Sequence, residues 1–196
     1  YPEGRVFPGY RLFSSRDSYS GVRIIRVPLI PRGRSKGLRL AANYLSFAVA
    51  ASLLGPCRCR GEFDVIFVFE PSPVTVGLPA VVIKRLRQIP LLFWVQDLWP
   101  ETLAATGVVR SRWVLNRVDE LVRYIYRHCD RVLVQSRGFA RHVCAQGVPP
   151  EKTCYFPNWA EDFFRPVDLP ADAPEHRELP PGFRILFAGN LGVSQS

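Results

Sequence analysis

The feature that most restricts the fold of this chain is a set of short apolar runs closed by proline, glycine or polar residues. The clearest run is Leu91–Val95, which lies between Pro90 and the polar pair Gln96 and Asp97. An apolar run of this length with turn signals at both ends is typical of a strand buried on both faces of a parallel sheet. Ligands of open α/β sheets bind outside the carboxyl ends of the strands. Asp97 therefore falls where a ligand is expected, although capping of the next helix would equally explain a carboxylate there.

Similar runs alternate with stretches of helical spacing along the chain. Further strands are predicted at residues 22–27, 64–69, 131–135, 153–156 and 183–187, and helices at residues 38–54, 74–88, 113–127 and 136–145. This alternation indicates βαβ units and a parallel sheet with helices on both faces. We expect residues 64–69 and Leu91–Val95 to be central strands. Gly55 and Pro56 are expected to end the first of these helices.

The end of the chain differs in composition from the rest. Residues 167–182 are rich in proline and acidic side chains, so they are predicted to be a linker. A strand at residues 183–187 with a glycine-bearing turn after it would begin a second unit, where a phosphate could bind. The chain contains no methionine and both ends look cut, so we interpret it as a fragment.

The charge of the chain favours an anionic partner. It has 26 Lys and Arg against 17 Asp and Glu, a net charge of +9, which suits nucleic acid, anionic lipid or a phosphate-bearing substrate. The cations form two clusters, one of Arg32, Arg34, Lys36 and Arg39 and one of Lys84, Arg85 and Arg87. A plain solvated surface is the alternative for each cluster. The five cysteines include no CxxC pair, so neither a disulfide framework nor a zinc site is predicted.

The predicted helix at residues 38–54 is near the shortest length that crosses a bilayer. Its apolar character is interrupted by Arg39, Asn43, Ser46 and Ser52. A packed helix that touches a membrane surface through its basic approach is therefore favoured over a transmembrane span.

Four motifs follow one another at definite spacings. They are Glu70-Pro71-Ser72-Pro73, Gln96-Asp97-Leu98-Trp99-Pro100-Glu101, Phe156-Pro157-Asn158-Trp159 and Phe187-Ala188-Gly189-Asn190-Leu191-Gly192. With these motifs in this order, the chain resembles the amino-terminal domain of bacterial family 4 glycosyltransferases. The likeness extends to the branch that builds O-antigen and capsule repeats, which includes N-acetyl-fucosamine transferases. The resemblance implies the GT-B architecture, with two Rossmann-like domains of the α/β class in which helices flank a parallel sheet.

The resemblance also implies a division of the chain and an activity. Residues 1–166 would form the acceptor-side Rossmann-like domain without its first strand, residues 167–182 a linker, and residues 183–196 the start of a donor-binding domain. The implied reaction is retaining transfer of a hexose or N-acetylaminosugar from a nucleotide sugar to a lipid-diphosphate-linked or saccharide acceptor. No metal or other cofactor is expected, and the fragment alone should be inactive. The implied location is cytoplasmic and peripheral, at the inner face of the plasma membrane.

The expected acceptor-side residues lie at or after strand ends. Asp97 is predicted to orient or deprotonate the acceptor hydroxyl, and Gln96 to hydrogen-bond the sugar. Further contacts with the acceptor are expected from Glu70, Ser72, Trp99 and Glu101. Local capping is the alternative for Asp97 and Gln96, a place in the core for Trp99, and stabilisation of a helix dipole for Glu101.

The expected donor-side residues are Gly189, Asn190 and Gly192, in the turn after the last predicted strand. Backbone N–H groups around the two glycines would bind phosphate oxygens. Many family members carry an Arg and a Lys where this chain has Asn190 and Gln195. The resemblance therefore leaves open which groups balance the charge of the donor diphosphate.

Two other classes of function are weighed against this hypothesis. A non-enzymatic α/β domain that binds nucleic acid would explain the charge, but the chain lacks an interleaved aromatic and basic motif. Half of a nucleotide-binding oxidoreductase would need a GxGxxG sequence after a strand, and the chain has none.

Overall fold

The computed structural model describes residues 16–33, 37–170 and 172–178, together with residues 180, 182, 183, 185 and 189. The chain divides into two compact units, Tyr1–Pro157 and Asn158–Ser196. The described part of the second unit contains one helix, α6 (Pro174–Glu178). The strand predicted at residues 183–187 lies largely outside the described residues.

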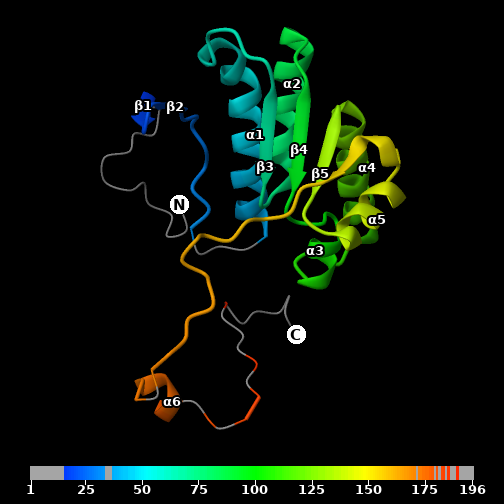
Figure 1. Cartoon of the computed structure of the whole chain (residues 1–196). Helices are drawn as coiled ribbons and strands as arrows, with labels where there is room; N and C mark the ends of the chain where they lie inside the picture. The colour runs from blue at the N-terminus through cyan, green and yellow to red at the C-terminus, as the bar shows by residue number, and fades with distance from the viewer. Residues whose placement is uncertain are drawn as a thin grey trace. The chain divides into compact units, whose positions relative to one another are not determined.

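The first unit is built on a sheet of four parallel strands in the order β3-β4-β5-β6 (Figure 1). The strands are β3 (Ile66–Glu70), β4 (Leu91–Val95), β5 (Arg131–Val134) and β6 (Thr153–Tyr155). The register pairs Glu70 with Val95 and Val95 with Val134, so three carboxyl ends meet at one edge of the sheet. The predicted α/β class with a parallel sheet and flanking helices is confirmed.

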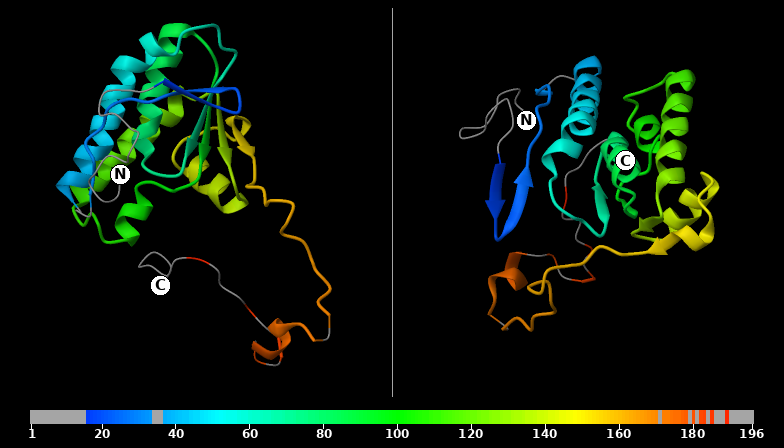
Figure 2. Two further views of the ribbon diagram at one scale, coloured as in Figure 1. Left: turned by 90° about the vertical axis from the view of Figure 1, so that its left-hand side faces the viewer. Right: turned by 90° about the horizontal axis from the view of Figure 1, so that it is seen from above.

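Helices connect the strands and supply a single apolar core. The longer helices are α1 (Leu38–Arg58), α2 (Gly77–Arg87), α4 (Arg112–His128) and α5 (Arg137–Ala145), and the short ones are η1 (Val74–Val76), α3 (Glu101–Ala105) and η2 (Pro150–Lys152). Alternate residues of β4, among them Phe93 and Val95, pack in this core with Val122 and Ile125 of α4. Figure 2 shows that α1, α2 and α4 lie on the same side of the sheet.

The expectation of helices on both faces is wrong for the described sheet. Each connection moves to the next strand in the same direction, so right-handed crossovers put all the connecting helices on one face. The other face carries four aromatic side chains, Phe67, Phe69, Trp94 and Phe156. Each of the other three rings lies between 5.0 and 5.9 Å from the Trp94 ring, centroid to centroid.

The expectation of central strands holds for β4 and is wrong for β3. Among the described strands β3 pairs only with β4, and its Phe67 and Phe69 remain about half exposed. The strand predicted at residues 22–27 is β2 (Val22–Ile25), which pairs antiparallel with β1 (Arg16–Tyr19), a strand that the sequence pattern did not reveal. The hairpin is a separate two-stranded sheet, so β2 is not part of the parallel sheet.

Helix α1 continues past the stop predicted at Gly55 and Pro56. A Cβ on the buried Gly55 would lie 3.3 Å from Cδ1 of Ile83, so the glycine permits close packing of α1 on α2. The guanidinium of Arg87 donates hydrogen bonds to the carbonyl oxygens of Pro56 and Cys59. These bonds satisfy acceptors that a helix end otherwise leaves unpaired, and they stabilise the additional turn.

Gly77 lies where α2 approaches α4 and the sheet most closely. A Cβ at this position would lie 2.6 Å from Cγ2 of Ile125 and 2.9 Å from Cε2 of Phe93, and both of these side chains are buried. We expect Gly77→Ala to lower the free energy of unfolding by about 1–3 kcal/mol, because the core must shift to admit the methyl group. Urea unfolding monitored by circular dichroism measures this loss.

Gly138→Ala in α5 is the matched control. A Cβ there would meet only Oγ of Ser136 within 4 Å, at 3.6 Å, and alanine is the better helix former. This variant should be as stable as the parent chain or more stable. Equal losses in the two variants would contradict overpacking as the cause.

Candidate functional site

The candidate site lies at the carboxyl edge of β3 and β4. Glu70 is the last residue of β3, and Gln96 and Asp97 directly follow β4. The N–H of Gln96 donates to the carbonyl oxygen of Glu70 at 3.1 Å. Gln135, which follows β5, donates from Nε2 to the carbonyl oxygen of Gln96, also at 3.1 Å. The structure thus brings three of the predicted residues together and adds Gln135 from the next strand.

The side chain of Glu70 is fully buried. Within the described part of the chain, neither of its carboxylate oxygens makes a well-formed hydrogen bond. Burial, and then the negative charge of Asp97, raise the pKa of Glu70 to about 8, and the nearby backbone N–H groups of Asp97 and Gln96 oppose this shift only in part. Glu70 is therefore mainly protonated at neutral pH, when it can both donate and accept a hydrogen bond.

Asp97 is partly exposed, and its orientation is fixed by the following helix. The hydroxyl of Thr102 in α3 donates to Oδ1 of Asp97 at 2.5 Å. Asp97 thus makes a local contact with the helix and also presents a carboxylate at the edge of the sheet. The sequence analysis did not identify Thr102, and the only signal for it was a hydroxyl residue early in the helix after the acid.

The remaining acceptor-side residues have different surroundings. Trp99 is buried in the core, and its ring meets that of Tyr44 of α1 edge-on, with 6.3 Å between the centroids. Oε1 of Glu101 lies 3.1 Å from Nε2 of His142, a contact that joins α3 to α5. Ser72 is exposed in the turn after β3 and has a positive φ of 142°. Of these side chains, Ser72 is open to solvent and Trp99 is part of the core.

Trp99 is also tied to α5 through its backbone. Nε2 of Gln146 donates to the carbonyl oxygen of Trp99 at 3.0 Å, and the same nitrogen lies 3.3 Å from Oδ1 of Asp119. Gln146 was not among the predicted residues, because neither helix-capping signals nor the spacing of apolar residues single it out. Its role is to hold the turn that follows Asp97.

Several buried polar atoms at this edge have no hydrogen-bond partner among the described residues. Besides the carboxylate of Glu70, they are Oγ1 of Thr75, Nε2 of Gln96 and Nε1 of Trp99. Buried polar groups in folded proteins are nearly always paired. Because these atoms are shielded from solvent, ordered water inside the domain can pair them.

The donor-side residues are described only in part. Gly189 is exposed in the second unit, whereas Asn190 and Gly192 lie outside the described residues. No three His, Cys, Asp or Glu side chains are grouped to hold a metal ion within the ranges that the structure describes.

A comparison with protein families gives one match. The family model described as glycosyl transferase 4-like domain matches residues 5–159, which is most of the chain. The matched range includes the whole carboxyl edge from Glu70 to Gln135. No curated protein matches the chain.

The buried carboxyl of Glu70 should make stability depend on pH. The folded chain holds this proton up to a pKa of about 8, whereas the unfolded chain releases it near 4.5. The stability that the proton confers is therefore complete below pH 4.5 and is lost as the pH rises towards 8. At about 1.4 kcal/mol per pH unit, we expect a loss of about 3 kcal/mol between pH 4.5 and pH 7.

Urea unfolding of the parent chain and of Glu70→Gln between pH 4.5 and 8.5 measures this effect. The amide has nearly the same shape and cannot ionise, so the variant should lack this part of the pH dependence. Glu62→Gln, at an exposed position, is the control and should follow the parent chain. Parallel curves for the parent chain and Glu70→Gln would show that Glu70 is already ionised.

Proposed function

This chain belongs to the family of glycosyl transferase 4-like domains, and on that premise we propose that it is the acceptor-side half of a GT-B enzyme. The proposed reaction is retaining transfer of a hexose or N-acetylaminosugar from a nucleotide sugar. The proposed acceptor is a lipid-diphosphate-linked sugar in the assembly of bacterial surface polysaccharide, such as O-antigen or capsule. The observation that supports this proposal best is the convergence of Glu70, Gln96 and Asp97 at one edge of the sheet.

The two carboxyl groups of this edge would have different tasks. Because Glu70 is buried beside the negative charge of Asp97, its pKa is raised and Glu70 carries the proton at neutral pH. Oδ1 of Asp97 is occupied by the hydroxyl of Thr102, and Oδ2 has no hydrogen-bond partner among the described residues. An acceptor hydroxyl that donates to Oδ2 would be oriented, and made more nucleophilic, by a fixed negative charge.

The unpaired polar atoms would then recognise the acceptor sugar. Nε2 of Gln96 would donate to a sugar hydroxyl after a local movement of its side chain, and the buried, protonated Glu70 would act on the ligand only through ordered water. Ser72 is exposed at the neighbouring strand end and can reach the solvent side of the ligand. In the reaction the bond between the donor sugar and its diphosphate breaks and the nucleoside diphosphate leaves, while the acceptor oxygen bonds to the sugar and its proton passes to Oδ2 of Asp97. The nucleotide sugar is a substrate, and the proposal includes no bound metal or other cofactor.

A lipid-linked acceptor requires the domain to approach a bilayer. We place it in the cytoplasm, peripherally at the inner face of the plasma membrane. Among the described helices, α1 alone is long and apolar enough to cross a membrane. Its contacts with the domain, Tyr44 with Trp99 and Gly55 with Ile83, support a helix that lies along the domain surface.

The two basic clusters differ in how many of their side chains already make contacts within the domain. Lys84 pairs with Asp130 at 2.5 Å, Arg85 contacts His128, and Arg87 caps α1. Arg32 and Arg39 are exposed at the approach to α1, whereas Arg34 and Lys36 lie outside the described residues. The cluster before α1 is therefore the better candidate for contact with anionic lipid, and no observation in the structure favours nucleic acid.

We expect Asp97→Asn to reduce turnover of the intact transferase by about 10²–10⁴-fold, because the amide cannot supply the fixed negative charge. Transfer of radiolabelled sugar to a lipid-linked acceptor measures the effect, and circular dichroism checks the fold. Glu120→Gln, on the exposed face of α4, removes a carboxylate elsewhere and should retain activity. Full activity of Asp97→Asn would remove Asp97 from the site.

We expect the chain to bind anionic vesicles and to leave them at high salt, since exposed charges are screened within about 10 Å at 0.1 M. Replacing Arg32, Arg34 and Lys36 by Ser should weaken binding about 100-fold, at about 1 kcal/mol for each charge. The matched control replaces the exposed Arg131, Arg137 and Arg141, which removes the same charge from another surface. Vesicle flotation compares them, and equal binding to neutral vesicles would indicate insertion of α1 instead.

A further inference from the structure

An apolar groove of about 490 Å³ runs along α1. One wall is the extended segment at residues 28–30, and the other is formed by Val49, Ala50, Leu53 and Leu54 of the helix. The groove is open along its length, because Ile30, Val49 and Leu53 are between 48 and 70% exposed. It lies outside the carboxyl edge described above and has no role in the chemistry proposed there.

Three hydrogen bonds tie residues 30 and 31 to the helix. The N–H of Ile30 donates to Oγ of Ser46 at 2.9 Å, and Nδ2 of Asn43 donates to the carbonyl oxygen of Ile30 at 2.5 Å. Nε of Arg39 donates to the carbonyl oxygen of Pro31 at 3.3 Å. The segment is thus fixed on the helix by its own hydrogen bonds. The groove offers little to a polar ligand or a peptide backbone, and it suits a hydrocarbon chain.

The exposed apolar surface continues along the helix beyond the groove. Leu38, Leu45, Val49 and Leu53 are all large, exposed and apolar, and their spacing of seven, four and four residues puts them on one face. The opposite face of α1 packs on the domain through Ala48, Ala51 and Gly55. A continuous apolar stripe on an otherwise charged surface marks a place where an apolar partner binds.

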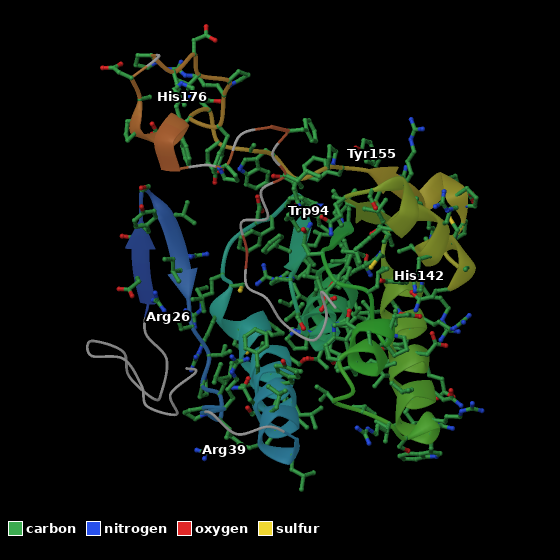
Figure 3. The ribbon with its side chains drawn as sticks, turned by 90° about the horizontal axis from the view of Figure 1, so that it is seen from below. Arg26, Arg39, Trp94, His142, Tyr155 and His176 are labelled. Atoms are coloured by element: carbon green, nitrogen blue, oxygen red, sulfur yellow. The ribbon has the colours of Figure 1, made fainter. Side chains whose placement is uncertain are left out.

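The residues around the groove carry an excess of positive charge. From residue 18 to residue 61 the sequence contains eight Arg and Lys and no Asp or Glu, and Asp17, just before this range, is paired with Arg26. Arg32 and Arg39 are exposed near the amino end of α1. Arg39, labelled in Figure 3, donates to the carbonyl oxygen of Pro31, which directly follows the groove residue Ile30. An amphiphile with an anionic head and a hydrocarbon tail would match this surface.

The direction of the groove relates it to the candidate site. The amino-terminal half of α1 lies beside the carboxyl edge of the sheet, since Tyr44 meets Trp99 just after Asp97 (Figure 1). The groove lies further along the helix, with Val49 about 15 Å from Arg39 at the usual rise per residue. A head group at Arg39 would thus be on the side of the site, and its tail would lead away from it.

We propose that the groove between α1 and residues 28–30 binds the isoprenoid chain of the lipid-diphosphate acceptor, with the diphosphate at Arg32 and Arg39. This inference rests on the proposed function for the identity of the lipid. It differs from general adhesion to a membrane, because one chain of one lipid occupies a defined groove. Arg39 has two tasks in this arrangement, since Nε holds the groove wall and the rest of the guanidinium faces the diphosphate.

Farnesyl diphosphate in vesicle-free buffer, below its micelle concentration, is the probe for this groove. Calorimetry with the purified chain should give saturable binding that is at least about tenfold tighter than that of inorganic diphosphate or of farnesol. Val49→Gln and Leu53→Gln should each weaken it about tenfold while the circular dichroism stays the same. The first control is Leu45→Gln, which is on the stripe but outside the groove, and the second is Leu86→Gln, exposed on α2. Both controls should bind as the parent chain does.

Three outcomes would overturn the proposal: no saturable binding by the parent chain, equal affinity for inorganic diphosphate, or equal losses in Leu45→Gln and Val49→Gln. The third outcome would indicate adsorption on the whole stripe. Because the assay contains no sugar donor, it measures binding of the lipid separately from sugar transfer. If the probe does not bind, the transferase proposal still stands. If the intact protein proves not to be a transferase, binding of the probe to the groove can still be measured.

Discussion

The structure depends on a single constraint, which is that every connection in the sheet steps to the neighbouring strand in the same direction. The connecting helices must then share one face, and one core forms between them and the inward side chains of β4 and β5. The same geometry aligns the carboxyl ends of β3, β4 and β5. It also leaves Phe67, Phe69 and Trp94 on the opposite face, where aromatic contacts take the place of helix packing.

The arrangement of the strands determines the protonation of Glu70. Its place in β3 points its side chain into the helix-covered core, while Asp97, just beyond the neighbouring strand, remains partly in contact with water. Burial and the negative charge of Asp97 keep the proton on Glu70. Thr102 fixes the direction of the Asp97 side chain. Two carboxyl groups of the same edge thus have different surroundings, one inside the core and one at the surface.

Local patterns were sufficient to predict the strands of the parallel sheet, the longer helices and the α/β class, because apolar runs and helical spacing are properties of neighbouring residues. They were not sufficient to place β3 at an edge or the helices on one face, since both depend on the order of strands. The end of α1 was missed because Arg87, a distant residue, supplies its cap. Trp99 could not be assigned from sequence either, because the ring that packs on it belongs to Tyr44. Glu70 and Asp97 were identified as candidates by position, but the difference in their burial appears only in the folded structure.

The contact between Arg87 and the end of α1 has a mechanical consequence. One guanidinium holds the carbonyl oxygens of Pro56, Cys59 and Gly61, so the carboxyl ends of α1 and α2 are clamped to each other. At the other end of α2, Gly77 is wedged against Ile125 and Phe93 without room for a methyl group. A helix held at both ends cannot slide or rotate by itself. We therefore expect α1 and α2 to move as one body, so that a displacement of α1 would be passed to α2 and to the core packed against Gly77.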